Sequence, residues 1–397
     1  MAVTADDVAA ARERIADVAR PTPVLPSATL SDQLGAAVGL KAENLQRTGS
    51  FKVRGATNKV SVLGDACGAG VVAGSAGNHA QALAHAARAR GVPCEVFMPT
   101  GAPLSKIEGA EALGAKVTIG GDTVLDCLEL ARARAAEAGM TVVHPFDDED
   151  VIAGQGTLGL ELLDDVPDLA KVVVPVGGGG LASGVAIAVK AARPQVEVVG
   201  VQVDVCAPFA GQEVAAHALT IADGIAVKRP GRITQPLVRE WLDAVVTVSE
   251  EQVAEAIVLL MERAKQVVEG AGAVGVAALM SGATGVAPDG TTVAILSGGN
   301  VDAGLLAEVA RRHETEMGRR LVVLTRISDR PGALARLLGI VGEEAANLIE
   351  VQHVREGLDN HVRETAVQLI LETRGRDHAA FVLAAIGAAG YEARVLR

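Results

Sequence analysis

Apolar and polar positions recur along the chain in patterns that predict its secondary structure. A helix is predicted after Thr4, a plausible N-cap, because apolar residues follow it at spacings of three and four. From about residue 40 to 310, a short β-branched run, a glycine-rich turn and a helical segment follow one another repeatedly, as at 71–78 and 172–181. Such units predict an α/β fold, with one or two mostly parallel sheets between helices.

The pattern changes near residue 311, where a charged stretch separates two apolar segments. The segments that follow are strand (321–327), helix (332–344), strand (347–355), strand (364–373), helix (378–389) and strand (392–396). This βαββαβ order predicts a ferredoxin-like unit. We therefore predict one domain over residues 1–315 and a second over 320–397.

Composition supports folded domains and narrows the class of protein. Of the 397 residues, 49% are apolar and 21% are charged, which suits packed cores and excludes a disordered chain. Aromatic residues make up only 2%, so the cores must consist of Val, Ile, Leu and Ala, which suit buried parallel strands. The net charge of −12 argues against nucleic acid or an anionic membrane as a partner, because both favour basic surfaces.

The sequence predicts a cytoplasmic protein. No segment approaches the ~20 apolar residues that a membrane-spanning helix needs. The N-terminal segment as far as Asp7 is acidic and lacks the apolar run of a signal peptide. The four cysteines form no Cys-x-x-Cys pair, as expected for isolated buried thiols in a reducing compartment.

The turn 177–180 consists of four glycines after a predicted strand. Backbone N–H groups at the start of the following helix are well placed to bind phosphate, although a flexible turn is an alternative. A third interpretation is a dinucleotide site, because Gly177, Gly179 and Ala182 fit Gly-x-Gly-x-x-Ala and Asp204 ends the next strand.

Lys52 stands between Phe51 and Val53 in the segment 43–56, Glu-Asn-Leu-Gln-Arg-Thr-Gly-Ser-Phe-Lys-Val-Arg-Gly-Ala. A lysine that such neighbours desolvate has a lowered pKa and can form a Schiff base. A surface lysine whose stem lies along apolar residues is the alternative.

The whole segment resembles the cofactor-lysine motif of the fold-type II pyridoxal-phosphate enzymes, the tryptophan-synthase-β-like family. Within that family it is most similar to the threonine dehydratase and serine racemase branch. Residues 1–315 carry the resemblance, through motifs at 43–56, 74–81, 177–181 and 297–300. It implies two parallel-sheet α/β subdomains, with a small one at about 45–145 inserted in the large one.

The resemblance also implies a role for individual residues. Lys52 would bind pyridoxal 5'-phosphate covalently, Phe51 would pack against its pyridine ring, and Asn78 would bond the ring hydroxyl oxygen. Ser297 would face the pyridine nitrogen. The phosphate would lie in the turn formed by Gly177, Gly178, Gly179, Gly180 and Leu181. The substrate carboxylate would bind backbone amides of Ser75, Ala76, Gly77, Asn78 and His79, with the His79 side chain in a structural role.

The implied reaction is the deaminating dehydration of L-threonine to 2-oxobutanoate and ammonia, with L-serine giving pyruvate as a side activity. Lys52 would take the Cα proton as general base. A hydroxyl at Ser297 need not keep the pyridine nitrogen protonated, which suits loss of a β-leaving group over transamination. Ala76 stands where family members that racemise serine have a serine, so elimination is expected over racemisation.

A cation site is a further hypothesis for the segment that contains Ala222 and Asp223. Related enzymes bind a cation near such an Ala-Asp-Gly sequence. Leu219 stands where some metal-binding relatives have an acidic residue, so a structural role for Asp223 is equally open.

The C-terminal segment carries Asp-Arg-Pro-Gly at 329–332, which resembles the turn that opens the first helix of ACT domains. Asp329 is expected to cap this helix and Pro331 to lie in its first turn. ACT domains pair side by side and bind amino acids at the interface. The expected effector site consists of Asp329, Pro331, Gly332, Ala333, Leu334 and Asn347.

The resemblance therefore implies an allosteric enzyme that forms a homotetramer or homodimer. Isoleucine is the first candidate effector, because 2-oxobutanoate feeds its synthesis; valine, threonine and serine are others. The alternatives to a biosynthetic threonine dehydratase are a catabolic one, a serine racemase with serine dehydratase activity, a dinucleotide-dependent dehydrogenase and a non-catalytic amino-acid sensor.

Overall fold

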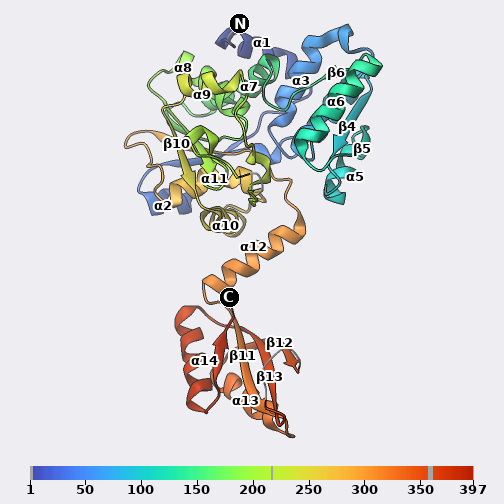
Figure 1. Ribbon diagram of the computed structural model, residues 1–397. Coiled ribbons are helices and arrows are strands. Elements are labelled where there is room, and N and C mark those ends of the chain that lie inside the picture. The colour runs from blue at the N-terminus through green and yellow to red at the C-terminus, as the bar shows by residue number, and fades with distance from the viewer. Residues whose placement is uncertain (1–2, 216–217, 356–360, 397) are drawn as a thin grey trace. The chain divides into compact units, whose positions relative to one another are not determined.

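The chain consists of two units, Met1–Asp302 and Ala303–Arg397, which are described separately. The computed structural model describes residues 3–215, 218–355 and 361–396, so the first two residues of the N-terminal segment lie outside it (Figure 1). Helix α12 (Ala303–Glu316) belongs to the second unit, although the sequence pattern assigned most of it to the first domain. None of the described helices is both long enough and apolar enough to cross a membrane.

The larger sheet of the first unit has six strands in the order β1-β2-β10-β7-β8-β9. All neighbours pair in parallel except β1, which lies antiparallel to β2 at the edge. The strands are β1 (Val24–Pro26), β2 (Val38–Ala42), β7 (Leu169–Pro175), β8 (Glu197–Val203), β9 (Ala244–Val248) and β10 (Thr291–Leu296). The central strands are buried along nearly their whole length, as the run of valines in β7 predicts for parallel strands between helices.

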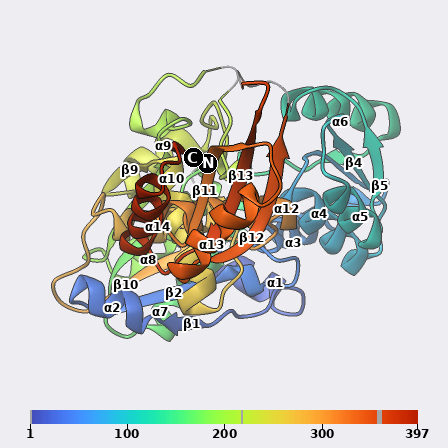
Figure 2. The same ribbon diagram turned by 90° about the horizontal axis from the view of Figure 1, so that it is seen from below.

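A second, smaller parallel sheet has the order β5-β4-β3-β6. Its strands are β3 (Val71–Gly74), β4 (Cys94–Met98), β5 (Lys116–Ile119) and β6 (Thr141–Val142). Its helices are α4 (Asn78–Arg90), α5 (Leu104–Ala112) and α6 (Val124–Ala138). Figure 2 shows these elements gathered in the blue to teal region of the unit. The predicted α/β fold with parallel sheets is thereby confirmed.

The remaining helices of the first unit pack closely where glycines face each other. They are α1 (Ala5–Ile15), α2 (Ala28–Leu34), α3 (Lys52–Leu63), α7 (Glu149–Asp165), α8 (Gly180–Ala192), α9 (Thr234–Trp241), α10 (Glu250–Leu259) and α11 (Gly270–Met280). A Cβ on Gly154 of α7 would lie 2.7 Å from the carbonyl oxygen of Arg54 in α3. A Cβ on Gly184 of α8 would lie 2.4 Å from the carbonyl oxygen of Ile152.

Helix α1 begins at the predicted N-cap Thr4, whose side chain accepts from the backbone N–H of Asp7.

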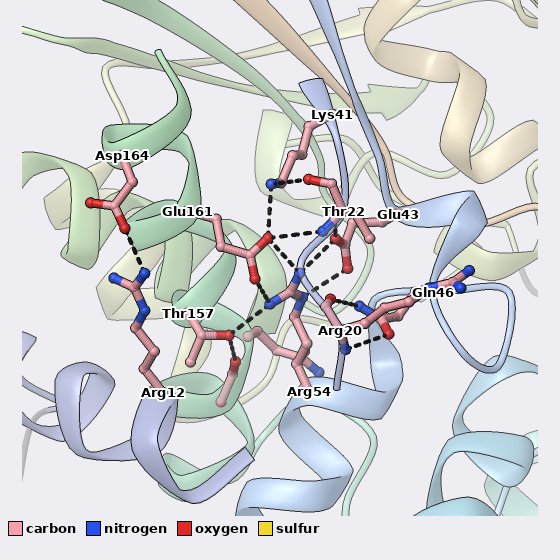
Figure 3. Close-up of polar contacts among 12 residues, drawn as sticks. Arg12, Arg20, Thr22, Lys41, Glu43, Gln46, Arg54, Thr157, Glu161 and Asp164 are labelled. Atoms are coloured by element: carbon pink, nitrogen blue, oxygen red, sulfur yellow. Dashed lines mark hydrogen bonds and ion pairs between the residues drawn. The ribbon is translucent and has the colours of Figure 1, made fainter. Parts of the chain in front are cut away.

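A buried network of charges joins α3 to α7 and β2 (Figure 3). The Arg54 guanidinium donates to both carboxylate oxygens of Glu43, each at 2.8 Å, and to those of Glu161 at 2.6 and 2.9 Å. Lys41 donates to Glu161 at 2.8 Å and to Asp165 at 3.1 Å. Because Arg54 lies in the first turn of α3, the network holds the N-terminal end of that helix in place.

The second unit has the predicted βαββαβ order and an antiparallel sheet, β12-β13-β11-β14 (Figure 1). Its elements after α12 are β11 (Arg320–Ser328), α13 (Ala333–Glu343), β12 (Asn347–Val354), β13 (Glu364–Glu372), α14 (Arg376–Ala388) and β14 (Ala393–Val395). Leu337 and Val341 of α13, with Val382 and Ile386 of α14, are buried with strand residues in a separate core.

Candidate functional site

Lys52 is the first residue of α3, and its amine lies beside Pro145 and Phe51. Its Nζ donates to the carbonyl oxygen of Pro145 at 2.9 Å and lies 5.1 Å from the centroid of the Phe51 ring. Burial lowers the pKa of this amine to about 8, while the carboxylate of Glu269 acts in the opposite direction. A much larger fraction of this amine is therefore neutral at neutral pH than in an ordinary lysine, and the neutral form can act as a nucleophile or base.

The four-glycine turn forms a close-fitting cradle at the start of α8. A Cβ on Gly178 would lie 2.2 Å from the Phe146 ring, and one on Gly177 would lie 3.0 Å from Cα of Ile225. Gly179 has φ +92°, a conformation that L side chains rarely adopt. Since α8 begins without a side-chain cap, its first backbone N–H groups are available to an anion.

The segment Pro145–Phe146 connects the amine to the cradle. Pro145 accepts from Lys52, and its neighbour Phe146 packs on Gly178. Asp147 then accepts from backbone N–H groups at the start of α9, including that of Ile233 at 2.7 Å. No pattern in the sequence points to these residues, because their role depends on contacts with segments far away in the chain.

Asn78 begins α4 and lies in a chain of side-chain hydrogen bonds. Its Nδ2 donates to Oε1 of Glu269 at 2.7 Å, and its Oδ1 accepts from Nδ2 of Asn300 at 2.8 Å. Asn300 Nδ2 also donates to the carbonyl oxygen of Thr48 at 2.8 Å. The loop before α3, the start of α4 and the segment after β10 therefore meet at Asn78.

Glu269 is a functional candidate that sequence analysis missed. It precedes α11, is only 5% exposed, and has a pKa raised to about 7 by burial and by the charge of Asp223. The hydrogen bond from Asn78 and the charges of Lys106 and Lys52 lower that pKa in part. One signal was available in the sequence. Glu269 directly precedes an apolar, glycine-rich helical segment that is expected to be buried, and a carboxylate is rarely buried without a partner.

The loop from Ser75 to His79 follows β3 and leads into α4. Ser75 Oγ accepts from the backbone N–H of Gly77 at 3.3 Å, and α4 begins without a side-chain cap. Nε2 of His79 lies 2.8 Å from the carbonyl oxygen of Val143, and burial lowers the pKa of this ring to about 3. The His79 ring is thus neutral and bonded to the backbone, so a ligand at this loop would meet backbone N–H groups.

Two further residues singled out in the sequence, Ser297 and Asp223, lie beside Phe51 and Glu269, respectively. Ser297 follows β10, is 2% exposed, and its carbonyl accepts from the backbone N–H of Phe51 at 3.1 Å. Asp223 forms an ion pair with Lys106 of α5 at 2.5 Å. Over residues 3–215, 218–355 and 361–396, no group of three or more His, Cys, Asp or Glu side chains is arranged to hold a metal ion. The cation site at Ala222 and Asp223 stays a prediction.

The expected effector loop in the second unit differs from its sequence interpretation in two respects. Asp329 does not cap α13, because its carboxylate forms an ion pair with Arg355 at 2.9 and 3.2 Å. The N-cap is Gly332, with φ +81°, so Pro331 precedes the helix instead of lying in its first turn. Asn347 lies beside Glu372 at the other end of the sheet and donates to it at 3.0 Å.

The structure thus brings together an amine of lowered pKa, an anion cradle and a half-buried amide bonded to a carboxylate. The amine is that of Lys52, the cradle that of Gly177 to Gly180, and the amide that of Asn78. Such a set can hold an anionic, carbonyl-bearing group covalently and exchange a proton with what is bound to it.

Comparisons with known proteins agree with this chemistry. Residues 15–298 match the family described as pyridoxal-phosphate dependent enzyme. The chain is 43% identical to the L-threonine ammonia-lyase of Thermotoga maritima, over 99% of this chain and 100% of that protein. It is 42% identical to the L-threonine ammonia-lyase of Geobacter sulfurreducens, over 98% of each. Among solved structures it resembles the threonine deaminase from T.th. (TM-score 0.71, 42% identity, 75% of this chain and 99% of that one). It also resembles maize serine racemase, with a TM-score of 0.73 and 33% identity over 80% of this chain and 99% of that one.

Proposed function

The chain belongs to the family of pyridoxal-phosphate dependent enzymes, and on this premise we propose that it is a threonine ammonia-lyase converting L-threonine to 2-oxobutanoate and ammonia. The observation that carries the proposal is the similarity to L-threonine ammonia-lyases over nearly the full length of both chains. The family match overturns the dehydrogenase interpretation, which explained only the glycine turn and Asp204.

The residues present fit the cofactor. The cradle at Gly177 to Gly180 leaves no room for a Cβ at Gly178, yet offers the uncapped N-terminus of α8 to a phosphate. Lys52 supplies an amine of lowered pKa for a covalent bond to the carbonyl carbon. Phe51 and Ser297 are joined by a backbone hydrogen bond beside that amine, where they would border the ring. When bound, pyridoxal phosphate withdraws electrons from the substrate Cα.

The proposed roles of the chain's own groups follow from their geometry. The N–H groups at Ser75 to His79, at the positive end of α4, hold the substrate carboxylate. Nζ of Lys52 is the group that would remove the Cα proton of the bound substrate. The carbonyl of Pro145 orients that amine, and burial keeps its pKa low enough to act as a base near neutral pH.

Two residues favour elimination over the competing serine racemase activity. Ala76 has no group able to exchange a proton on the second face of the substrate. Ser297, as a hydroxyl, provides no negative charge to keep the pyridine nitrogen protonated, which favours loss of the β-hydroxyl group. L-serine would react in the same way and yield pyruvate.

We further propose that the second unit is an ACT regulatory domain of a homo-oligomer, and that isoleucine inhibits the enzyme as the end product of its pathway. The βαββαβ order and the Asp329 to Leu334 turn support the proposal. The two full-length ammonia-lyase relatives also extend through this unit. An effector must bind two states of the enzyme with different affinity to have this effect.

The test is steady-state keto-acid formation from L-threonine and L-serine, with and without isoleucine. We expect 2-oxobutanoate from threonine, none from Lys52→Ala, and a lower rate with isoleucine. Absence of keto acid from both substrates, in protein with bound cofactor, would refute the ammonia-lyase proposal. Formation of D-serine without keto acid would instead assign a racemase.

A further inference from the structure

A chain of side-chain amides leaves Asn78 only one orientation. The carbonyl of Thr48 can only accept, so Asn300 must present its Nδ2 to it, and the same Nδ2 donates to Oδ1 of Asn78. Nδ2 of Asn78 is thereby turned toward Oε1 of Glu269, 2.7 Å away. The reverse orientation would bring two NH₂ groups together at one end and an amide oxygen against a carboxylate at the other.

Glu269 completes this chain and uses only one of the two hydrogens on Asn78 Nδ2. The second hydrogen remains for the cofactor, whose ring oxygen requires a donor there if Asn78 has the role that the family resemblance implies. We propose that Glu269 is a positioning residue, which holds the Asn78 amide toward the ring oxygen of pyridoxal phosphate and controls by its charge the electrostatic environment of that oxygen. The proposal needs the cofactor but not threonine as the substrate.

The surroundings of Glu269 allow that charge to change near neutral pH. Burial and Asp223, from the 3-10 turn Asp223–Ile225, raise its pKa to about 7. Asn78 from α4, Lys106 from α5 and Lys52 from α3 act in the opposite direction. The ionised carboxylate favours a proton near the ring oxygen, and the neutral acid does not, so the visible absorption of the bound cofactor is expected to titrate with Glu269.

The first experiment is a pH titration of the visible spectrum of the substrate-free holoenzyme. The native protein should show an inflection as Glu269 titrates, and Glu269→Gln should lose it. Glu255→Gln is the matched control, since Glu255 is an exposed glutamate on α10, and it should titrate as the native protein does. Retention of the inflection in Glu269→Gln would overturn the proposal.

A second pair of variants leaves Glu269 in place and remains informative if Glu269→Gln does not fold. Asp223→Asn removes a charge that raises the Glu269 pKa and leaves Lys106 unpaired, so the inflection should move to lower pH. Lys106→Gln should move it to higher pH. Shifts in the same direction, or none, would contradict the assignment. Because no substrate is present, these results stay separate from any failure of the ammonia-lyase proposal.

Discussion

Glu161→Gln is expected to destabilise the first unit far more than Asp164→Asn, although both carboxylates lie on α7 and both bind an arginine (Figure 3). The Glu161 side chain is 12% exposed and bonds the buried Arg54 and Lys41. Removing one member of a buried ion pair costs about 3–5 kcal/mol. Since Glu43 still pairs with Arg54, we expect the lower end, about 3 kcal/mol.

The ion pair of Asp164 with Arg12 serves as the control, because it is exposed to solvent. The two side chains are 56% and 49% exposed, and such pairs contribute about 0–1 kcal/mol to stability. Urea unfolding followed by Trp241 fluorescence measures the relevant unit, because this single tryptophan of the chain packs against the cores of the first unit. The free energy of unfolding should fall by about 3 kcal/mol in Glu161→Gln and by less than about 1 kcal/mol in Asp164→Asn.

The stability lost in Glu161→Gln should become smaller as the pH falls into the acid range. Arg54 and Lys41 lower the pKa of Glu161 below its usual 4.5, against the effect of burial. Its stabilisation is therefore present above that unfolded value and is lost as pH falls through the lower folded value. Equal losses in the two variants at neutral pH, or a Glu161→Gln loss that grows in acid, would refute this account.

Three further predictions concern the site and the second unit. Gly178→Ala should abolish cofactor binding, measured by the absorbance of the purified protein, because its Cβ would overlap the Phe146 ring; Gly101→Ala, with open space around it, should bind normally. In the apo-protein, Glu269 has a folded pKa of about 7 against 4.5 unfolded, so native stability should fall as pH rises between these values. Glu269→Gln should remove this loss of about 3 kcal/mol, measured by urea unfolding at the two pH limits. Asp329→Asn, which weakens an exposed pair with Arg355, should reduce isoleucine inhibition while leaving the uninhibited rate unchanged; unaltered inhibition would argue against this effector loop.

Secondary structure and fold class were predictable because they depend on patterns that are local in the chain. The predicted helix at 332–344 is observed as Ala333–Glu343, and the predicted strand at 364–373 as Glu364–Glu372. Thr4 caps its helix as expected, since the capping partner lies three residues away. Lys52 could be named as the candidate cofactor lysine for a similar reason, because the motif around it is one continuous segment.

The prediction that Asp329 caps its helix was wrong, and the extent of the second unit was not evident from the sequence, since both depend on competition between contacts. Helix α12 belongs to the second unit, which no local pattern of charges could decide. Asp329 had a suitable position to cap α13, but Arg355 offers its carboxylate a bidentate ion pair across the fold.

The sequence by itself determined the order of helices and strands, the family and the residues of its contiguous motifs. Only the tertiary structure decided which of these groups meet. Glu269 bonds Asn78 across 191 residues, and Glu161 bonds Arg54 across 107. The physical reason is that a carboxylate's pKa and orientation depend on the donors, charges and burial that the folded chain places around it, and no spacing in the sequence contains those distances.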